Sequence, residues 1–283
     1  MNLVETVGED KTCRYAGRLT TLRLMLIDYH MHTRLTDAVG EPADYAKVAV
    51  ERGLAEIGCS DHAPLGNRDT DWHLKLADLE TYVDWVQEAQ AKFPQLSIKL
   101  GLEVDFIPGR EDWIRELAQM HGWDFFLGSV HYIGDWPVDL SAKSWEGRDV
   151  DATWREYFEL WKQAARTGLF DSLAHPDLPK KFSFRPTTYF TDVFESALTV
   201  AANSDVAIEV STAGLRKPCR EIYPSVEFLK IARRLGVPVT LGSDAHLPQE
   251  VGQDFDKAVK LLRSCGYDKI CRFTQRKREL VNL

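Results

Sequence analysis

Short apolar runs alternate along this chain with longer segments of helical periodicity, roughly every 25 to 40 residues. The apolar runs lie at 24–29, 55–60, 98–103, 125–130, 171–174, 206–210 and 237–242. The helical patterns lie at 43–52, 79–93, 111–121, 153–167, 189–202, 225–235 and 249–264, and Gly53, Gly168 and Gly236 fall where helices are expected to end. This alternation predicts a parallel sheet with crossover helices. Seven such units without a domain break favour one α/β domain, a closed or nearly closed barrel.

Length and composition agree with a barrel that fills most of the chain. The 283 residues suit a single α/β barrel, and a hydrophobic fraction of 44% is enough for a large core. We expect residues 25–283 to form the barrel and residues 1–24 to be a polar arm. The chain shows no apolar run long enough for a membrane span and no secretory signal, so we expect a cytoplasmic protein without a membrane partner.

Charge and cysteine content narrow the choice of partner and cofactor. The formal net charge of -8 weighs against nucleic acid as a partner, because proteins that bind it usually carry a basic face. Five cysteines, an odd number without a CxxC pair, predict neither a disulfide framework nor a thiolate zinc site. Cys59 lies in an apolar run and is expected to be buried.

Residues able to bind metal follow the predicted strands at their C-terminal ends. In chain order these are His30 and His32, Asp61 and His62, Glu103, His131, His175, and Asp244 and His246; Ser211, Thr212 and Arg216 follow the sixth strand. Six of the eight histidines therefore lie at strand ends, and this is the face where barrels carry their chemistry. His73, in an insertion at 63–78, is compatible with a surface position or with substrate contact. His121 lies near a helix end, where we expect a structural role.

The spacing of these residues indicates a shared metal centre. Residues at i and i+2 of an extended chain point to one side, so His30 and His32 can bind one ion and Asp244 and His246 can face the same cavity. Imidazole and carboxylate ligands together suit Zn, Fe or Mn, and a carboxylate such as Glu103 can bridge two ions. Ions in such a cluster would share a hydroxide and bind a phosphoryl group.

These segments resemble the polymerase and histidinol phosphatase (PHP) superfamily. The resemblance rests on Asp28-Tyr29-His30-Met31-His32-Thr33, Ser60-Asp61-His62, Glu103, His131, His175 and Ser243-Asp244-Ala245-His246, and it covers about residues 26 to 265. The segments 101–109, 127–132, 174–182, 209–216 and 223–225 resemble the histidinol-phosphate phosphatase branch. The resemblance implies a distorted (β/α)7 TIM-like barrel, a trinuclear metal centre, and hydrolysis of L-histidinol phosphate to L-histidinol and phosphate.

The resemblance also implies a division of ligands among two or three divalent ions. His30, His32, Glu103 and Asp244 would hold one ion, Glu103, His131 and His175 a second, and Asp37, His62 and His246 a third. Some relatives place a histidine near the position of Asp37, so this ligand departs from their pattern. Ser211 and the Pro176-Asp177 pair also depart from it, outside the ligand set.

A mechanism follows from these ligands. A metal-bridging hydroxide would attack phosphorus, with Glu103, Asp244 and His246 acting through it. We expect Arg216 to hold the phosphate through its planar fork, with Lys180, Lys181 and Arg185 as further candidates. In the loop 132–151, Asp135, Asp139 or Glu146 would meet the substrate amine, and Tyr132 and Trp136 would pack on its ring or serve only to pack the loop.

Three other functions fit parts of the pattern. A PHP-type phosphoesterase acting on nucleotides or other small phosphate esters would use the same ligands. A metal-dependent amidohydrolase shares the first His-x-His but normally needs a middle-strand lysine and a final lone aspartate, whereas this chain has Glu103 and Asp244-x-His246. A non-catalytic metal-binding domain would often lose ligands, and this set is nearly complete.

Overall fold

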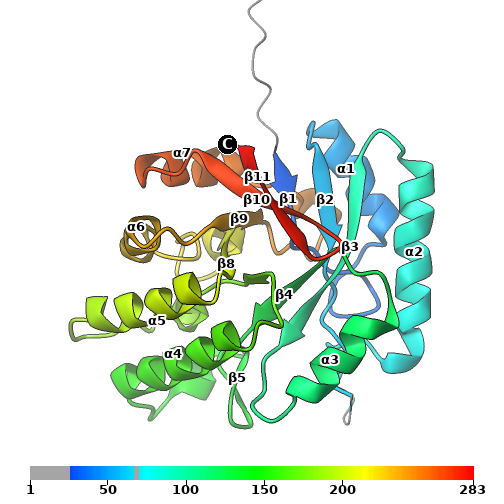
Figure 1. The fold of residues 1–283 in the computed structure, drawn as a ribbon. Coiled ribbons are helices and arrows are strands. Elements are labelled where there is room, and N and C mark those ends of the chain that lie inside the picture. Colours follow the sequence, from blue (N-terminus) through cyan, green and yellow to red (C-terminus); the bar gives the residue numbers. More distant parts are fainter. Residues whose placement is uncertain (1–25, 67–69) are drawn as a thin grey trace, which may run out of the picture.

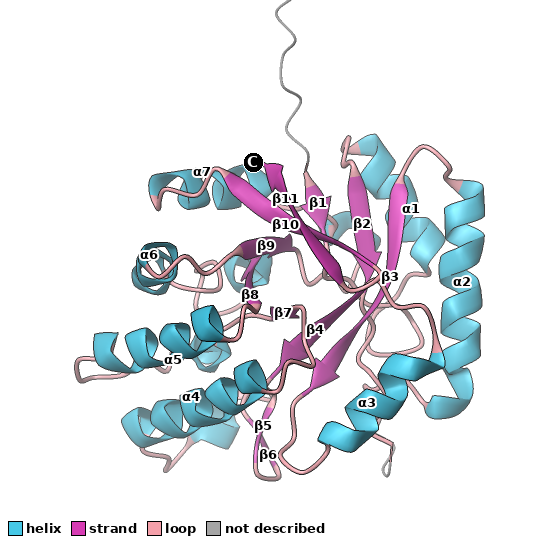
Figure 2. Cartoon of the chain, viewed as in Figure 1, coloured by secondary structure: helices cyan, strands magenta, loops and turns pink. Residues whose placement is uncertain are grey.

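The computed structural model describes residues 26–66 and 70–283. Seven parallel strands surround a central axis and helices cover them on the outside (Figures 1 and 2). The expected arm at 1–24 lies outside the described residues. Within the described part of the chain, no helix is long and apolar enough to cross a membrane.

The strands form a nearly closed barrel in the order β1-β2-β3-β4-β7-β8-β9. Their bounds are β1 (Ile27–Asp28), β2 (Glu56–Cys59), β3 (Ser97–Asp105), β4 (Phe125–Ser129), β7 (Ser172–Leu173), β8 (Ala207–Ser211) and β9 (Val239–Gly242). The first and last strands meet, because the Tyr29 amide donates to the Leu241 carbonyl at 3.0 Å and Met31 bridges in parallel to Ala245. The predicted distorted seven-stranded barrel is confirmed.

Seven helices of the described chain connect these strands. They are α1 (Pro42–Glu51), α2 (Leu79–Lys92), α3 (Glu111–Met120), α4 (Val150–Arg166), α5 (Thr191–Asn203), α6 (Val226–Arg234) and α7 (Phe255–Ser264). Gly53, Gly168 and Gly236 take positive φ values of 71°, 67° and 74° just past α1, α4 and α6, as predicted for helix ends. The helix expected from residue 249 begins at Phe255 instead, because a 3-10 turn at Pro248–Glu250 and a left-handed Asp254 precede it.

A C-terminal hairpin, β10 (Lys269–Thr274) with β11 (Lys277–Asn282), was not predicted. It lies across the N-terminal ends of the barrel strands, opposite the predicted metal site (Figure 1). Arg276 pairs with Asp171 just before β7, and Arg272 donates to Glu56 at the start of β2 at 2.8 Å. Its residues are largely charged, so their weak alternation gave little signal for a strand.

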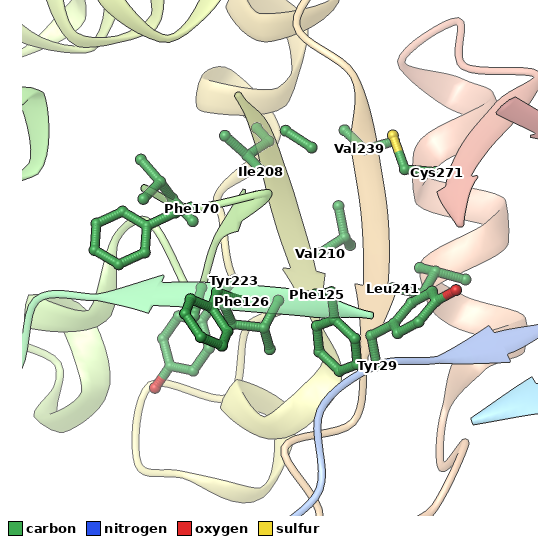
Figure 3. Packing of buried hydrophobic residues seen from close by; sticks show 14 of the residues in the cluster. Tyr29, Phe125, Phe126, Phe170, Ile208, Val210, Tyr223, Val239, Leu241 and Cys271 are labelled. Atoms are coloured by element: carbon green, nitrogen blue, oxygen red, sulfur yellow. The ribbon is translucent and has the colours of Figure 1, made fainter. Parts of the chain in front are cut away.

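Aromatic and branched side chains fill the barrel interior and pack between sheet and helices (Figure 3). The rings of Tyr29 and Phe125 meet edge to face, 4.8 Å apart. Gly58 and Gly101 leave the space that the Phe125 ring occupies, because a Cβ at either glycine would approach this ring to 2.6 Å or less. The expected burial of Cys59 is confirmed, and the described cysteines form no disulfide.

Candidate metal centre

The barrel brings the predicted ligands to its C-terminal mouth. His30 and His32 follow β1, His62 follows β2, Glu103 lies in β3, His131 follows β4, His175 follows β7, and Asp244 and His246 follow β9. The six from His30 to His175 are buried, whereas His246 and Asp37 are about one-third exposed, at 29% and 35% of their side chains. The sequence separation of these residues is closed because parallel strands all end at the same rim.

Glu103 is the hub of the cluster. Its Oε1 lies 2.9 Å from His175 Nε2 and 3.6 Å from His131 Nε2. Its Oε2 lies 3.0 Å from His62 Nδ1 and 3.2 Å from His30 Nε2. One carboxylate therefore faces four imidazoles from four different strand ends, which is the arrangement expected of a bridging ligand.

Asp244 and Asp37 complete the cluster toward solvent. Asp244 Oδ1 lies 3.3 Å from His32 Nε2, and Asp37 Oδ2 lies 3.2 Å from His246 Nε2. Ligand atoms gather within 4.8 Å in four overlapping groups: His30-His32-Asp244, His30-Glu103-His175, His62-Glu103-His131 and His32-His62-His246. The assignment of each ligand to a particular ion stays a prediction.

The cluster fits divalent cations on the evidence of its unpartnered atoms. Buried side-chain atoms without a hydrogen-bond partner in the described structure include His30 Nε2, both ring nitrogens of His32, Glu103 Oε2 and His175 Nδ1. Buried polar atoms are normally paired, because an unpaired one costs about 1–3 kcal/mol. Nitrogen and carboxylate donors that converge without pairing are a donor set suited to Zn, Fe or Mn.

Mutual interactions perturb the ionisation of the cluster. Burial alone would raise the pKa of Glu103, but His30, His62 and His131 hold this pKa well below its usual range. Burial opposes protonation of His131, but Asp105 and Glu103 raise its pKa to about 10. Cation binding must displace such protons, so it competes with them.

Two further buried carboxylates orient the ligands, and the sequence analysis did not assign them roles. Glu209, in β8, contacts His30 Nδ1 through Oε1 at 2.7 Å and accepts from the His175 amide through Oε2 at 2.8 Å. Asp105, two residues past Glu103, contacts His131 Nδ1 at 2.9 Å. Each contact leaves the opposite ring nitrogen directed at the cluster. A charged residue within an apolar strand, as in 206–210, was the available signal.

Backbone strain accompanies two of the ligands. His175 and Asp244 have positive φ values of 24° and 50°, a region that side-chain-bearing residues rarely occupy. Arg216 braces the second segment, because its Nη2 donates to the carbonyls of Ser243 at 2.6 Å and Asp244 at 3.1 Å. Strain of this kind persists where surrounding contacts impose it, commonly at functional sites.

The cluster forms the floor of a pocket of about 310 Å³. Its walls include Trp72, Pro137, Asp139, Leu140, Lys181, Lys217 and Tyr223. Lys181 donates to the Asp139 carboxylate at 2.9 Å, so a cation and an anion lie together beside the metal ligands. A volume of this size accommodates a small molecule rather than a polymer.

The structure separates the four cations predicted to bind phosphate. Lys181 lines the pocket. Lys180 is fully buried, and its Nζ is bound to Asp177 and to the Ile222 carbonyl, each at 2.8 Å, so the prediction that it faces the substrate is wrong. Arg185 pairs with Glu221 in a separate hollow. Arg216 lies behind Asp244 with Nη1 unpartnered, and its contact with phosphate stays a prediction.

The loop residues also separate. Among the described residues, the pocket lining includes Asp139 but neither Asp135 nor Glu146. Trp136 packs on Trp145 and under Arg148 rather than in the pocket.

Tyr132 and the two remaining histidines are placed as follows. Tyr132 stacks on Trp72, a pocket residue that the sequence analysis missed. A surface position for His73 is wrong, because it is 4% exposed and bound to Asp105 at 2.7 Å. His121 lies outside the pocket, 3.3 Å from Glu80.

Comparison with known families decides the relationship. The model of the PHP domain matches residues 28–213, and the model of a PHP-associated region matches residues 228–254. The chain belongs to the PHP family. The first match contains eight of the nine predicted ligands' strand regions up to β8, and the second ends just past Asp244 and His246.

Individual relatives of this PHP chain span nearly its whole barrel. A probable histidinol-phosphatase of Deinococcus radiodurans is 41% identical over 247 residues, which is 85% of this chain and 94% of the relative. A histidinol-phosphatase of Bacillus subtilis is 25% identical over 81% of this chain and 96% of its own length. The crystal structure of the Lactococcus lactis histidinol phosphate phosphatase, complexed with zinc, L-histidinol and phosphate, has the same fold, with a TM-score of 0.80 and 24% identity over 90% of this chain and 99% of that chain.

Proposed function

We propose that this PHP-family chain is a metal-dependent phosphomonoesterase that hydrolyses L-histidinol phosphate to L-histidinol and phosphate. The observation that carries the proposal is the buried Glu103 hub, faced by four imidazoles beneath a pocket that also holds Lys181 and Asp139. The Deinococcus relative, named a probable histidinol-phosphatase, supports the choice of substrate. A cytoplasmic location belongs to the same proposal.

The metal-binding residues would be the nine predicted ones, and they would hold two or three divalent ions of Zn, Fe or Mn. When bound, such ions supply Lewis acidity toward phosphoryl oxygens and activate water at neutral pH. Glu103 would bridge ions, Glu209 would keep His30 in the tautomer that directs Nε2 inward, and Asp105 would do the same for His131. Asp244 and His246 would complete the ligand shell nearest the solvent-facing substrate.

The pocket pair suits a substrate with both charges. L-Histidinol phosphate carries a phosphate and an ammonium group two carbons from the ester oxygen. Lys181 would bind the phosphate and Asp139 the ammonium, so the substrate would replace the 2.9 Å contact between these two residues with one contact to each. The Lys181 side chain is 19% exposed and that of Asp139 is 25% exposed, so both can reach a ligand.

Phosphate release from a panel of esters tests the proposal. The purified protein should release phosphate from L-histidinol phosphate faster than from nucleotides and sugar phosphates, and a chelator should abolish the reaction until metal is returned. Lys181→Ala should raise KM more than it lowers kcat. A preference for nucleotides would support a different PHP-type phosphoesterase, and full activity of the metal-free protein would refute the mechanism.

A further inference from the structure

Three apolar residues form one side of the pocket mouth above the metal ligands. Trp72, Pro137 and Leu140 all line the pocket, and we call them the apolar rim. Leu140 is 70% exposed, and Trp72 is half-buried. A leucine so exposed contributes little to the core, so its place at a pocket mouth needs another explanation.

The rim is a connected structure rather than a set of isolated side chains. The indole of Trp72 stacks on Tyr132 with ring centroids 5.9 Å apart and planes inclined by 22°. Tyr132 in β5 (Tyr132–Ile133) pairs with Pro137 in β6 (Trp136–Pro137), and Leu140 follows three residues later. The insertion after β2 and the loop after β4 therefore meet at this rim.

The rim is also held in register with the metal ligands. The Trp72 ring meets the ring of His62 edge to face at 4.7 Å and that of His131 at 5.5 Å. His73, next to Trp72, is bound to Asp105, and the same carboxylate contacts His131. The Val138 amide donates to the His131 carbonyl at 2.8 Å. A phosphate at the pocket floor would therefore direct the organic part of its ester along this rim.

We propose that the apolar rim of Trp72, Pro137 and Leu140 is the specificity surface that receives the heteroaromatic ring of the substrate. This inference rests on the proposed function, because it takes the ester to be one with an imidazole side chain. Asp139 lies beside Leu140 and Pro137, so the ammonium group and the ring of one substrate would meet neighbouring groups. An imidazole ring can make an edge-to-face contact with indole and an apolar contact with leucine.

Two esters that differ only in the ring test the proposal. L-Histidinol phosphate is compared with 2-aminoethyl phosphate, which keeps the amine and the phosphate but lacks the imidazolylmethyl group. Trp72→Ala and Leu140→Ser should each lower kcat/KM for L-histidinol phosphate by about tenfold while that for 2-aminoethyl phosphate stays within about twofold. Calorimetry should show weaker binding of L-histidinol to both metal-loaded variants and unchanged binding of inorganic phosphate.

Matched variants separate ring contact from loop order and from general loss of surface leucine. Trp113→Phe removes the hydrogen bond from Trp113 Nε1 to the Pro64 carbonyl, 2.7 Å long, at the other end of the same insertion, and it should leave the ratio of the two esters unchanged. Leu280→Ser alters a leucine that is 55% exposed on the C-terminal hairpin and should also leave it unchanged. Metal content and melting temperature of each variant show whether the site is intact.

The outcomes distinguish this inference from the proposed function. A wild-type protein that cleaves L-histidinol phosphate well, with the ratio of the two esters unchanged in both Trp72→Ala and Leu140→Ser, overturns the rim alone. A change of equal size in Trp113→Phe also overturns it, because loop order would then explain the effect. A wild-type protein without preference for L-histidinol phosphate overturns the proposed function, and the rim inference with it.

Discussion

Replacement of Glu209 by glutamine tests whether a residue that would touch no ion controls metal binding. Glu209 is fully buried. One oxygen lies 2.7 Å from His30 Nδ1 and the other accepts from the His175 amide at 2.8 Å. The amide N–H is always a donor, and His30 Nδ1 is a donor whenever Nε2 faces an ion. Glutamine offers one oxygen and one NH₂ group to two donors, so one donor must face another.

The size of the effect follows from this mismatch. A buried donor left without an acceptor costs about 1–3 kcal/mol, and loss of a carboxylate that orients a metal-binding histidine typically lowers metal affinity by about 10–100-fold. The two figures agree, because a 10–100-fold change in Kd is about 1.4–2.7 kcal/mol. The side chain has little room to adjust: a Cβ added at Gly242 would lie 1.8 Å from Glu209 Oε1.

Competition titration of the metal-free protein with Zn²⁺ against a chelating indicator measures this affinity. The matched control is Glu56→Gln, the same substitution at a carboxylate 2% exposed that accepts from Ser97 and Arg272 at the opposite end of the barrel. We expect Glu56→Gln to lower the melting temperature with and without zinc but to leave the Kd for zinc unchanged. Wild-type zinc affinity in Glu209→Gln, or an equal loss in Glu56→Gln, would refute the reasoning.

Three other substitutions probe the hub, a buried ion pair and the core. Glu103→Ala should abolish phosphatase activity and lower the metal content per chain while the circular dichroism spectrum stays native, because bridging is lost; an active variant with full metal content would exclude the hub. Lys180→Met should lower the free energy of unfolding in urea by about 3–5 kcal/mol, since Asp177 is left as a buried unpaired charge; an unchanged urea midpoint would contradict this. Gly101→Ala should cost about 1–3 kcal/mol in calorimetric stability, because the new methyl would approach the Phe125 ring to 2.4 Å, and a wild-type melting temperature would show that the ring moves aside at little cost.

Elements of the barrel and their order were predictable from the chain. Each strand of the parallel barrel is buried on both faces and reads as a short apolar run, and the helices between them keep one apolar stripe. The hairpin β10–β11 escaped prediction because Arg272, Arg276 and Arg278 make it look like a polar tail. Its place is determined by acidic partners such as Glu56, Asp171 and Asp205, which are distant in sequence and close only in the folded barrel.

Candidate ligands were predictable for a related reason. Histidine and carboxylate at successive strand ends are a local pattern, and parallel strands in a barrel deliver such residues to one rim. Residues that act through contacts with other elements gave no comparable signal. Lys180 and Lys181 are adjacent in sequence, yet one is buried against Asp177 and the other lines the pocket, because a 3-10 turn at Leu178–Phe182 directs them differently.

The sequence by itself determined the class of fold, the order of strands and helices, and the set of residues able to bind metal, because these depend on periodicity and on position relative to a strand end. Only the tertiary structure decided which charges orient the ligands, which cation reaches the pocket and which apolar side chains form its rim. Those properties depend on distances between elements far apart in the chain, and local pattern carries no information about such distances until the barrel has closed.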